Sequence, residues 1–240
     1  MKKLIEKIIT TSYNSKEGHI ASSLSVLDIL YTFYENFSDK NRLILSKGHA
    51  SLGLYVVLDH FNLLEYDLKE FCEFNGRLGG HPSDKIKNVE ASTGSLGHGL
   101  PIGLGLALGN KIQNIEGNIY VIIGDGESNE GTIWESALLA SQHKLNNLFC
   151  VLDHNRSNDR ALIIDNMIDK FKSFNWNCVE IDGHNPTEIK SAFEIKSDKP
   201  TFILANTIKG KGVPMMENNP EWHHKAPNDD EYIKILSETK

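Results

Sequence analysis

The chain has 240 residues, enough for one large domain or two small ones on a scale of about 150 residues per domain. Hydrophobic residues make up 40% and charged residues 24%, a balance that excludes a disordered or fibrous protein. The net charge is −7, which argues against a general nucleic-acid or anionic-membrane binder, because such proteins need a surplus of Lys and Arg.

The cysteines and the N-terminus indicate a cytoplasmic protein. Cys72, Cys150 and Cys178 are far apart and form no CxxC pair, so we expect buried free thiols in a reducing compartment. The basic start of the chain is interrupted by Glu6 and Lys7, and no small-residue cleavage site follows, so it predicts an amphipathic helix and not a signal peptide. No apolar run approaches the ~18 residues of a membrane span.

The first half of the chain predicts helices and one long loop. Apolar residues at helical spacing predict helices over 2–12 and about 23–37, a short strand over 42–46 and a helix over 48–60. The segment 76–99 holds six glycines in 24 residues and shows little periodicity. Loops of that length inside a compact domain are usually functional or disordered.

The second half alternates regularly between strands and helices. The predicted strands are 118–124, 147–153, 177–182 and 201–205, and the predicted helices are 128–144, 166–174 and 186–196. Continuous apolar strands that alternate with helices indicate a mostly parallel sheet with helices on both faces. We therefore expect a single α/β domain over residues 1–240, with a C-terminal tail from about 210.

Two strand ends carry unusual chemistry. Strand 118–123 runs into Gly124-Asp125-Gly126, where two glycines allow a sharp turn and leave room for a ligand beside the carboxylate. The next strand ends near Asn155, and ligands of parallel α/β sheets bind beyond the carboxyl ends of strands. A carboxylate, an amide oxygen and a nearby carbonyl suit Mg²⁺ or Ca²⁺.

Glycines elsewhere have two different explanations. The glycine-rich loop 93–99 opens a helix, whose free N–H groups could bind an anion. The spacing of Gly103, Gly105 and Gly109 is similar to that of a dinucleotide-binding motif. These glycines lie inside an apolar predicted helix that follows no strand, so helix packing explains them better. Gly-Asp-Gly taken alone is also common in ordinary turns.

The chain resembles the transketolase family over nearly its whole length. Gly-Asp-Gly followed by Asn155 matches the thiamine diphosphate motif. The other similar segments, in order, are ILSKGHAS (44–51), EASTGSLGHGL (90–100), GDGESNEGTIWESALLASQHKLNNL (124–148), IDGH (181–184), TIKGKGV (207–213) and MENNPEWHHKAP (216–227). The resemblance is to the diphosphate-binding N-terminal domain. The ending is similar to the separate N-terminal subunit of two-subunit transketolases.

This resemblance implies a thiamine diphosphate-binding fold and a site for that cofactor with Mg²⁺, or Ca²⁺ in its place. The implied metal ligands are Asp125, Asn155 and the backbone carbonyl of Ser157. The implied cofactor contacts are His49, Gly94, Ser95, Leu96, Gly124, Asp125, Gly126, Glu130, Asn155, Lys209 and His223. Glu130 and Glu135 match glutamates at the interface between paired cofactor sites.

Histidines supply most of the implied catalytic groups. His19, His49, His81 and His223 match residues of the substrate channel or cofactor pocket, and catalytic roles are implied for His19, His49, His81 and Glu130. Histidine suits proton transfer because it titrates near neutral pH. We expect His60, His143 and His184 to be structural or solvated. Lys225 matches a lysine near the diphosphate in some members.

The chain also departs from the family pattern. Ile20 stands in a GHIAS segment where many single-chain relatives have a GHPG-like sequence. His98 replaces a glutamine and His224 replaces a glycine, so the preferred sugar could differ from ordinary pentose phosphates. Segments 36–42 and 156–168 look shorter than usual, and the second shortening bears on the assignment of Ser157.

The resemblance implies that catalysis needs a second, pyrimidine-binding domain, whose glutamate protonates the aminopyrimidine of the cofactor. The residues after 205 are too few for that domain, so we expect a partner subunit to supply it in an α₂β₂ assembly.

The leading hypothesis is a transketolase subunit that, with this partner, transfers a two-carbon ketol unit from a ketose, often phosphorylated, to an aldose. The alternatives are a related enzyme of specialised sugar or secondary metabolism, a deoxyxylulose-phosphate synthase, and a cofactor-free paralogue.

Overall fold

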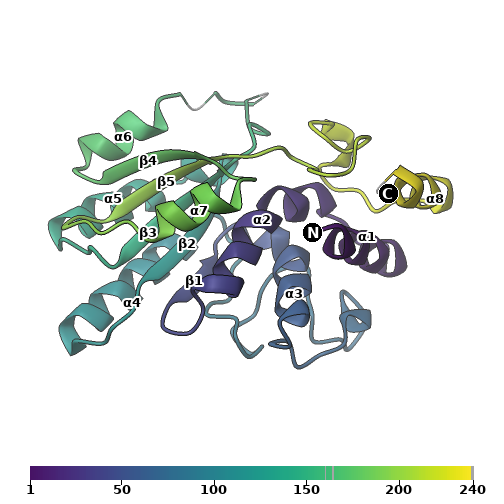
Figure 1. Ribbon diagram of the computed structural model, residues 1–240, viewed down its shortest axis with the longest axis horizontal. Coiled ribbons are helices and arrows are strands. Elements are labelled where there is room, and N and C mark those ends of the chain that lie inside the picture. Colours follow the sequence, from purple (N-terminus) through teal and green to yellow (C-terminus); the bar gives the residue numbers. More distant parts are fainter. Residues whose placement is uncertain (160, 164, 239–240) are drawn as a thin grey trace.

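A computed structural model describes residues 1–159, 161–163 and 165–238. Its centre is a five-stranded sheet in the order β1-β2-β3-β5-β4, and every neighbouring pair is parallel (Figure 1). The strands are β1 (Arg42–Leu45), β2 (Ile119–Gly124), β3 (Leu148–His154), β4 (Asn177–Asp182) and β5 (Thr201–Asn206). The five predicted strands are confirmed, with ends shifted by a residue.

The central strands form where the chain is continuously apolar, because both faces of the sheet are covered. All six residues of β2 are buried. Tyr120 and Ile122 pack into the core on one face, and Val121 and Ile123 pack into the core on the other. Strand β4 lies at the edge and is mostly half-buried, which explains its more polar sequence.

Helices cover both faces of the sheet, as the alternation predicts (Figure 1). On one face α2 (Ile20–Asn36) and α7 (Pro186–Phe193) cover the sheet, and α1 (Lys2–Ser15) and α3 (Ser51–His60) pack on α2. The other face carries α4 (Gly99–Gln113), α5 (Gly131–Gln142) and α6 (Met167–Ser173). Two predicted helices begin with a short 3₁₀ turn, Gly48–Ala50 before α3 and Gly126–Asn129 before α5. The segment 76–99 forms no helix or strand before Gly99, as expected.

The tail after residue 210 is more ordered than its composition predicts. It contains a 3₁₀ turn, Pro220–Trp222, and the helix α8 (Asp229–Glu238). Tyr232 of α8 stacks on Tyr13 of α1 with ring centroids 4.1 Å apart, and its hydroxyl lies 3.1 Å from the Thr10 hydroxyl. The side chain of Ile235 is fully buried. These contacts fix the tail to the N-terminal helix.

The cysteines are only partly as the sequence predicts. The three cysteines are free thiols, but only Cys150 is buried, while Cys72 and Cys178 are half-buried.

In the segment 156–168, positions 160 and 164 lie outside the described residues. Across the ranges that the structure describes, no helix is both long enough and apolar enough to cross a membrane.

The glycines of α4 differ in what surrounds them. A Cβ atom at Gly103 would lie 2.3 Å from Cγ2 of Val121, so this glycine lets α4 pack closely on β2. A Cβ at Gly105 would meet nothing within 4 Å, and one at Gly109 would meet only Gln113 of the same helix. The packing explanation is therefore confirmed for Gly103, whereas Gly105 and Gly109 pack on no other element within the described part of this chain.

We expect alanine substitutions at Gly103 and Gly105 to have opposite effects. G103A should lower the free energy of unfolding by about 1–3 kcal/mol, because the methyl group overpacks the core. G105A should raise it by about 0.5–1 kcal/mol, because alanine is the better helix former. Urea unfolding of the two variants measures both effects. Equal destabilisation by the two substitutions would contradict this packing.

Candidate active site

The predicted site residues gather in a cleft at the carboxyl ends of β1, β2 and β3. The cleft has a volume of about 320 Å³. The predicted residues that line it are His19, His49, His81, Gly94, Leu96, Gly124, Asp125, Gly126, Asn155, Ser157, Lys209 and His223. A larger cavity, of about 870 Å³, lies between α1 and the segment 67–73, and none of the predicted site residues line it.

Two predicted cofactor contacts, Ser95 and Glu130, are exposed and lie outside the residues that line the cleft. Glu130 packs against the glycine-rich loop, since a Cβ at Gly97 would approach the Glu130 side chain to 2.6 Å. Glu135 is also exposed, on α5. Lys225 pairs with Glu231 and lies 4.5 Å above the Trp222 ring, outside the cleft.

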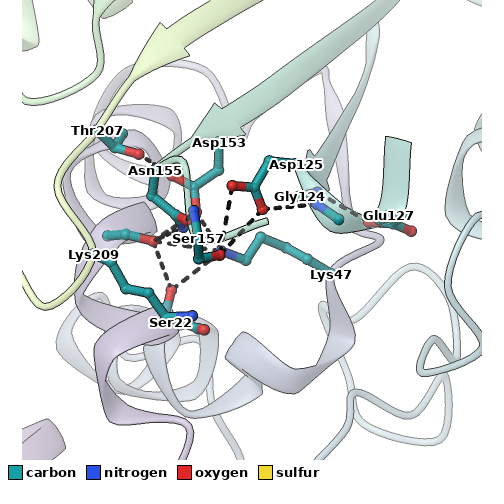
Figure 2. A network of polar contacts seen from close by, with 12 residues as sticks. Ser22, Lys47, Gly124, Asp125, Glu127, Asp153, Asn155, Ser157, Thr207 and Lys209 are labelled. Atoms are coloured by element: carbon teal, nitrogen blue, oxygen red, sulfur yellow. Dashed lines mark hydrogen bonds and ion pairs between the residues drawn. The ribbon is translucent and has the colours of Figure 1, made fainter. Parts of the chain in front are cut away.

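The three predicted metal ligands form one hydrogen-bonded group (Figure 2). Ser157 donates its backbone N–H to Asn155 Oδ1 over 3.1 Å and its hydroxyl to Asp125 Oδ1 over 3.2 Å. The side chain of Asp125 also accepts N–H groups from Gly126 and Asn158. A carboxylate and an amide oxygen held this close are the hard donors that Mg²⁺ or Ca²⁺ prefers. The residues present therefore fit such a cation.

The glycines beside Asp125 are not required by the backbone conformation. Neither Gly124 nor Gly126 has a positive φ angle, so the expected sharp turn is not the reason for them. Both line the cleft, and a Cβ at Gly126 would approach the Asn158 side chain to 3.3 Å. Because glycine has no side chain, both positions leave space for a ligand beside the Asp125 carboxylate. This space is the other explanation for the two glycines given by the sequence.

Glu127 occupies the helix N-terminus where an external anion was expected. Its buried carboxylate accepts N–H groups from Gly97 over 2.8 Å and Gly124 over 3.1 Å, and it also accepts the Ser46 hydroxyl. Burial raises the pKa of Glu127, although these hydrogen bonds oppose the shift. This side chain joins the glycine-rich loop to the ends of β1 and β2.

A fully buried ion pair lies beneath the metal-ligand group. Lys47, after β1, pairs with Asp153 of β3, and their side chains are 1% and 0% exposed. Burial opposes ionisation of Asp153, but the Lys47 ammonium and hydrogen bonds from Lys47, Ser25 and Thr207 hold the pKa of this carboxyl below its usual range. Figure 2 shows the pair next to Asn155.

Four residues that line the cleft are not predicted as site residues from the sequence: Ser22, Lys47, Glu127 and Asn158. Glu127 follows the Gly-Asp-Gly motif directly, and Lys47 comes soon after an apolar strand. A charged residue in such a position could have indicated a buried, paired group, because lysine and glutamate are almost never fully buried without a partner.

Neutral histidines border the opening of the cleft. The His19 ring lies 5.2 Å from the His49 ring and 4.4 Å from the His224 ring, between centroids. Burial, together with repulsion from nearby basic groups, His224 first, lowers the pKa of His19 to about 4. Burial and the charge of Lys47 lower the pKa of His49 to about 2. Both rings are therefore neutral at pH 7, and each can donate one hydrogen bond and accept another.

Lys209 and His223 add a second group on the far side of the cleft. Lys209 Nζ lies 2.7 Å from His223 Nδ1. Burial and the charge of Lys47 lower the pKa of Lys209 to about 8, and burial and Lys209 lower the pKa of His223. An anion placed between Lys47 and Lys209 would relieve this repulsion, so the cleft fits a phosphate or diphosphate group.

His184 confirms its expected structural role. Its Nδ1 lies 2.7 Å from Asp28 of α2, and its Nε2 accepts the backbone N–H of Ile208 over 2.8 Å. This ring therefore fixes the backbone just before Lys209. His60 and His143 are exposed, as expected.

Comparison with known proteins gives a consistent result. The sequence matches the family described as "Transketolase, thiamine diphosphate binding domain" over residues 13–239. It is 32% identical to one subunit of an apulose-4-phosphate transketolase from Phocaeicola vulgatus, over 97% of this chain and 90% of that protein. It is 32% identical to one subunit of a 6-deoxy-6-sulfo-D-fructose transketolase from a Clostridium species, over 92% of this chain and 88% of that protein.

The fold is also similar to that of solved transketolases. A transketolase variant from Pichia stipitis superposes with a TM-score of 0.85 at 26% identity, over 99% of this chain. The chain spans 40% of the length of that protein.

The lowered pKa of His49 predicts a pH-dependent stability. The pKa of His49 is lower in the folded state than its unfolded value of about 6.5, so its contribution is complete above pH 6.5 and is lost as the pH falls below that value. Between pH 8 and pH 5 we expect wild type to lose about 2 kcal/mol more than H49Q. Urea unfolding at the two pH values measures this difference. Parallel losses in wild type and variant would contradict a buried neutral His49.

Proposed function

Because the chain belongs to the transketolase family and matches its thiamine diphosphate-binding domain, we propose that it acts as the diphosphate-binding half of a two-subunit transketolase. It transfers a two-carbon ketol unit from a ketose to an aldose, together with a pyrimidine-binding partner. The observation that carries this proposal is the cleft in which an oxygen-donor group, two buried lysines and neutral histidines converge.

In this proposal Asp125, Asn155 and the Ser157 carbonyl would hold Mg²⁺, which would neutralise charge on the diphosphate of the cofactor. Lys209 adds a positive charge on the same side, and Gly124 and Gly126 leave the space that the diphosphate occupies. Thiamine diphosphate, when bound, supplies the carbanion chemistry that breaks and forms the carbon–carbon bond. The chain's own task is to bind, orient and neutralise the anionic end of the cofactor.

The histidines orient the sugar. His19 and His49 are neutral at pH 7, so each can hold a sugar hydroxyl through one donor and one acceptor atom without adding charge. His81 and His223 line the same cleft, and we assign them to the same channel. Proton transfer to and from the hydroxyls is the catalytic role proposed for these rings.

Two features support a partner chain. Both named relatives are described as transketolase subunits. Helices α4 and α5 carry large apolar side chains that are exposed in the single chain: Ile102 at 39%, Leu138 at 58% and Leu139 at 47%. Exposed apolar residues of this size mark protein–protein contacts when they are contiguous. We propose that this surface, with Glu130 and Glu135 beside it, is buried in an α₂β₂ assembly of which residues 1–240 form the diphosphate-binding domain.

The substrate is proposed to be a ketose with an anionic terminus. One relative is named for a sugar 4-phosphate and the other for a 6-sulfo sugar. Both names therefore describe sugars with an acidic group at the end of the carbon chain. His224 approaches His19 at the mouth of the cleft. An added ring at this point favours a specialised sugar over ordinary pentose phosphates.

The test is a ketol-transfer assay with the chain and its partner, each alone and then mixed, using a ¹³C-labelled ketose phosphate and following the transfer by NMR. We expect turnover only in the mixture, only with thiamine diphosphate and Mg²⁺, and a loss of at least about 100-fold in the mixture with D125N.

The matched control is D39N, because Asp39 is an exposed aspartate on the turn before β1. This variant should leave the rate unchanged. Full turnover by the isolated chain, or an equal loss with D39N and D125N, would overturn the proposal.

A further inference from the structure

The amide group of Asn155 has different partners at its two ends. Its Nδ2 atom donates to Asp153 Oδ2 over 3.3 Å and to Ser25 Oγ over 3.2 Å. Its Oδ1 atom accepts the backbone N–H of Ser157 over 3.1 Å, and Ser157 in turn donates its hydroxyl to Asp125 (Figure 2). The side chain is buried, with 6% exposed.

The charge of Asp153 decides which way this amide points. An ionised carboxylate only accepts hydrogen bonds, so the amide atom that faces it must be the NH₂ group. The oxygen must then face the opposite way, toward Ser157 and Asp125. A neutral amide at position 153 could donate as well as accept, so only the Ser157 N–H would then oppose a flip of the Asn155 side chain.

Asp153 is itself held in place on several sides. Lys47 pairs with its Oδ2 atom, and Ser25 donates its hydroxyl to the same atom over 2.6 Å. Thr207, after β5, donates its hydroxyl to Oδ1. Groups from α2, from the ends of β1 and β3 and from the chain after β5 therefore converge on one carboxylate.

We propose that Asp153, held by Lys47, is a positioning residue that forces Asn155 to present its Oδ1 atom to the metal ion. This inference rests on the proposed function, since it requires a divalent cation at Asn155. It assigns the Lys47–Asp153 ion pair a role that acts through Asn155. Partners behind a metal ligand typically change metal affinity by about 10–100-fold when they are replaced.

A cycle of variants separates orientation from general stability. The variant K47M/D153N removes both charges together, because removing one partner alone would leave a buried charge without its counter-ion. N155D replaces the amide by a carboxylate, which presents an oxygen whichever way it turns. The cycle consists of wild type, K47M/D153N, N155D and the triple variant. Each is assembled with the partner chain in the presence of thiamine diphosphate.

The readout is the dissociation constant of Mn²⁺, obtained from the electron paramagnetic resonance signal of the free ion. We expect K47M/D153N to weaken Mn²⁺ binding by about 10–100-fold in the Asn155 background. In the N155D background, the same pair of substitutions should cost less than about threefold, because either orientation then supplies an oxygen ligand. K47M/D153N leaves the net charge of the site unchanged in both backgrounds, because it removes one positive and one negative charge.

The matched control is K7M/D59N, which removes the ion pair between α1 and α3 on the surface. It should leave the Mn²⁺ dissociation constant within about twofold of wild type. Thermal unfolding without metal establishes that each variant is folded. If K47M/D153N does not fold, S25A takes its place in the cycle, because Ser25 is the second acceptor for Asn155 Nδ2.

The outcomes separate this inference from the proposed function. An equal cost in the Asn155 and N155D backgrounds, or no cost in either, would overturn the positioning role while wild type still binds Mn²⁺. Failure of wild type to bind Mn²⁺ with thiamine diphosphate would overturn the proposed function, and the inference with it.

Discussion

The buried ion pair between Lys47 and Asp153 organises the carboxyl edge of the sheet. It joins the ends of β1 and β3 across β2, which lies between them in the sheet. The register of β2 and β3 pairs Gly124 with Asp153, so Asp125 and Asn155 leave neighbouring strands at the same level. An ion pair without solvent contact stabilises a fold only when further hydrogen bonds satisfy its charges, and Ser25 and Thr207 supply them.

The cleft carries charged groups of both signs in the single chain. Lys47 and Lys209 both face it, and the lowered pKa of Lys209 reflects burial and the charge of Lys47. The histidines around them remain neutral because burial and these same charges oppose their protonation. A diphosphate with its cation fits such a site, because the anion is attracted to the lysines and the cation is attracted to Asp125.

The sequence predicts the architecture well because its signals are local. Continuous apolar strands such as Ile119–Ile123 predict both the parallel sheet and the edge at which ligands bind. The same signals predict that Asp125 and Asn155 lie together, which the structure confirms. Helix α8 is not predicted, because its contacts are long-range: Tyr232 finds Tyr13 at the other end of the chain.

The partners behind the site are harder to predict from sequence. Lys47, Asp153 and Ser25 lie far apart in the chain, and only the folded sheet brings them together. The glycine-rich loop before α4 predicts N–H groups that could bind an anion, and the N–H of Gly97 in that loop binds the carboxylate of Glu127 in the same chain. Local patterns identify the groups that could bind a ligand. They do not reveal which of these groups the protein uses for itself.

In the proposed assembly this chain holds the metal ion and the diphosphate of a cofactor site that a partner chain completes. This role can be tested by calorimetric titration of thiamine diphosphate with Mg²⁺ into the mixed subunits, with wild-type chain and with D125A. We expect saturable binding of one cofactor per chain with wild type and none with D125A. Equal binding by both mixtures, or no binding by the wild-type mixture, would contradict it.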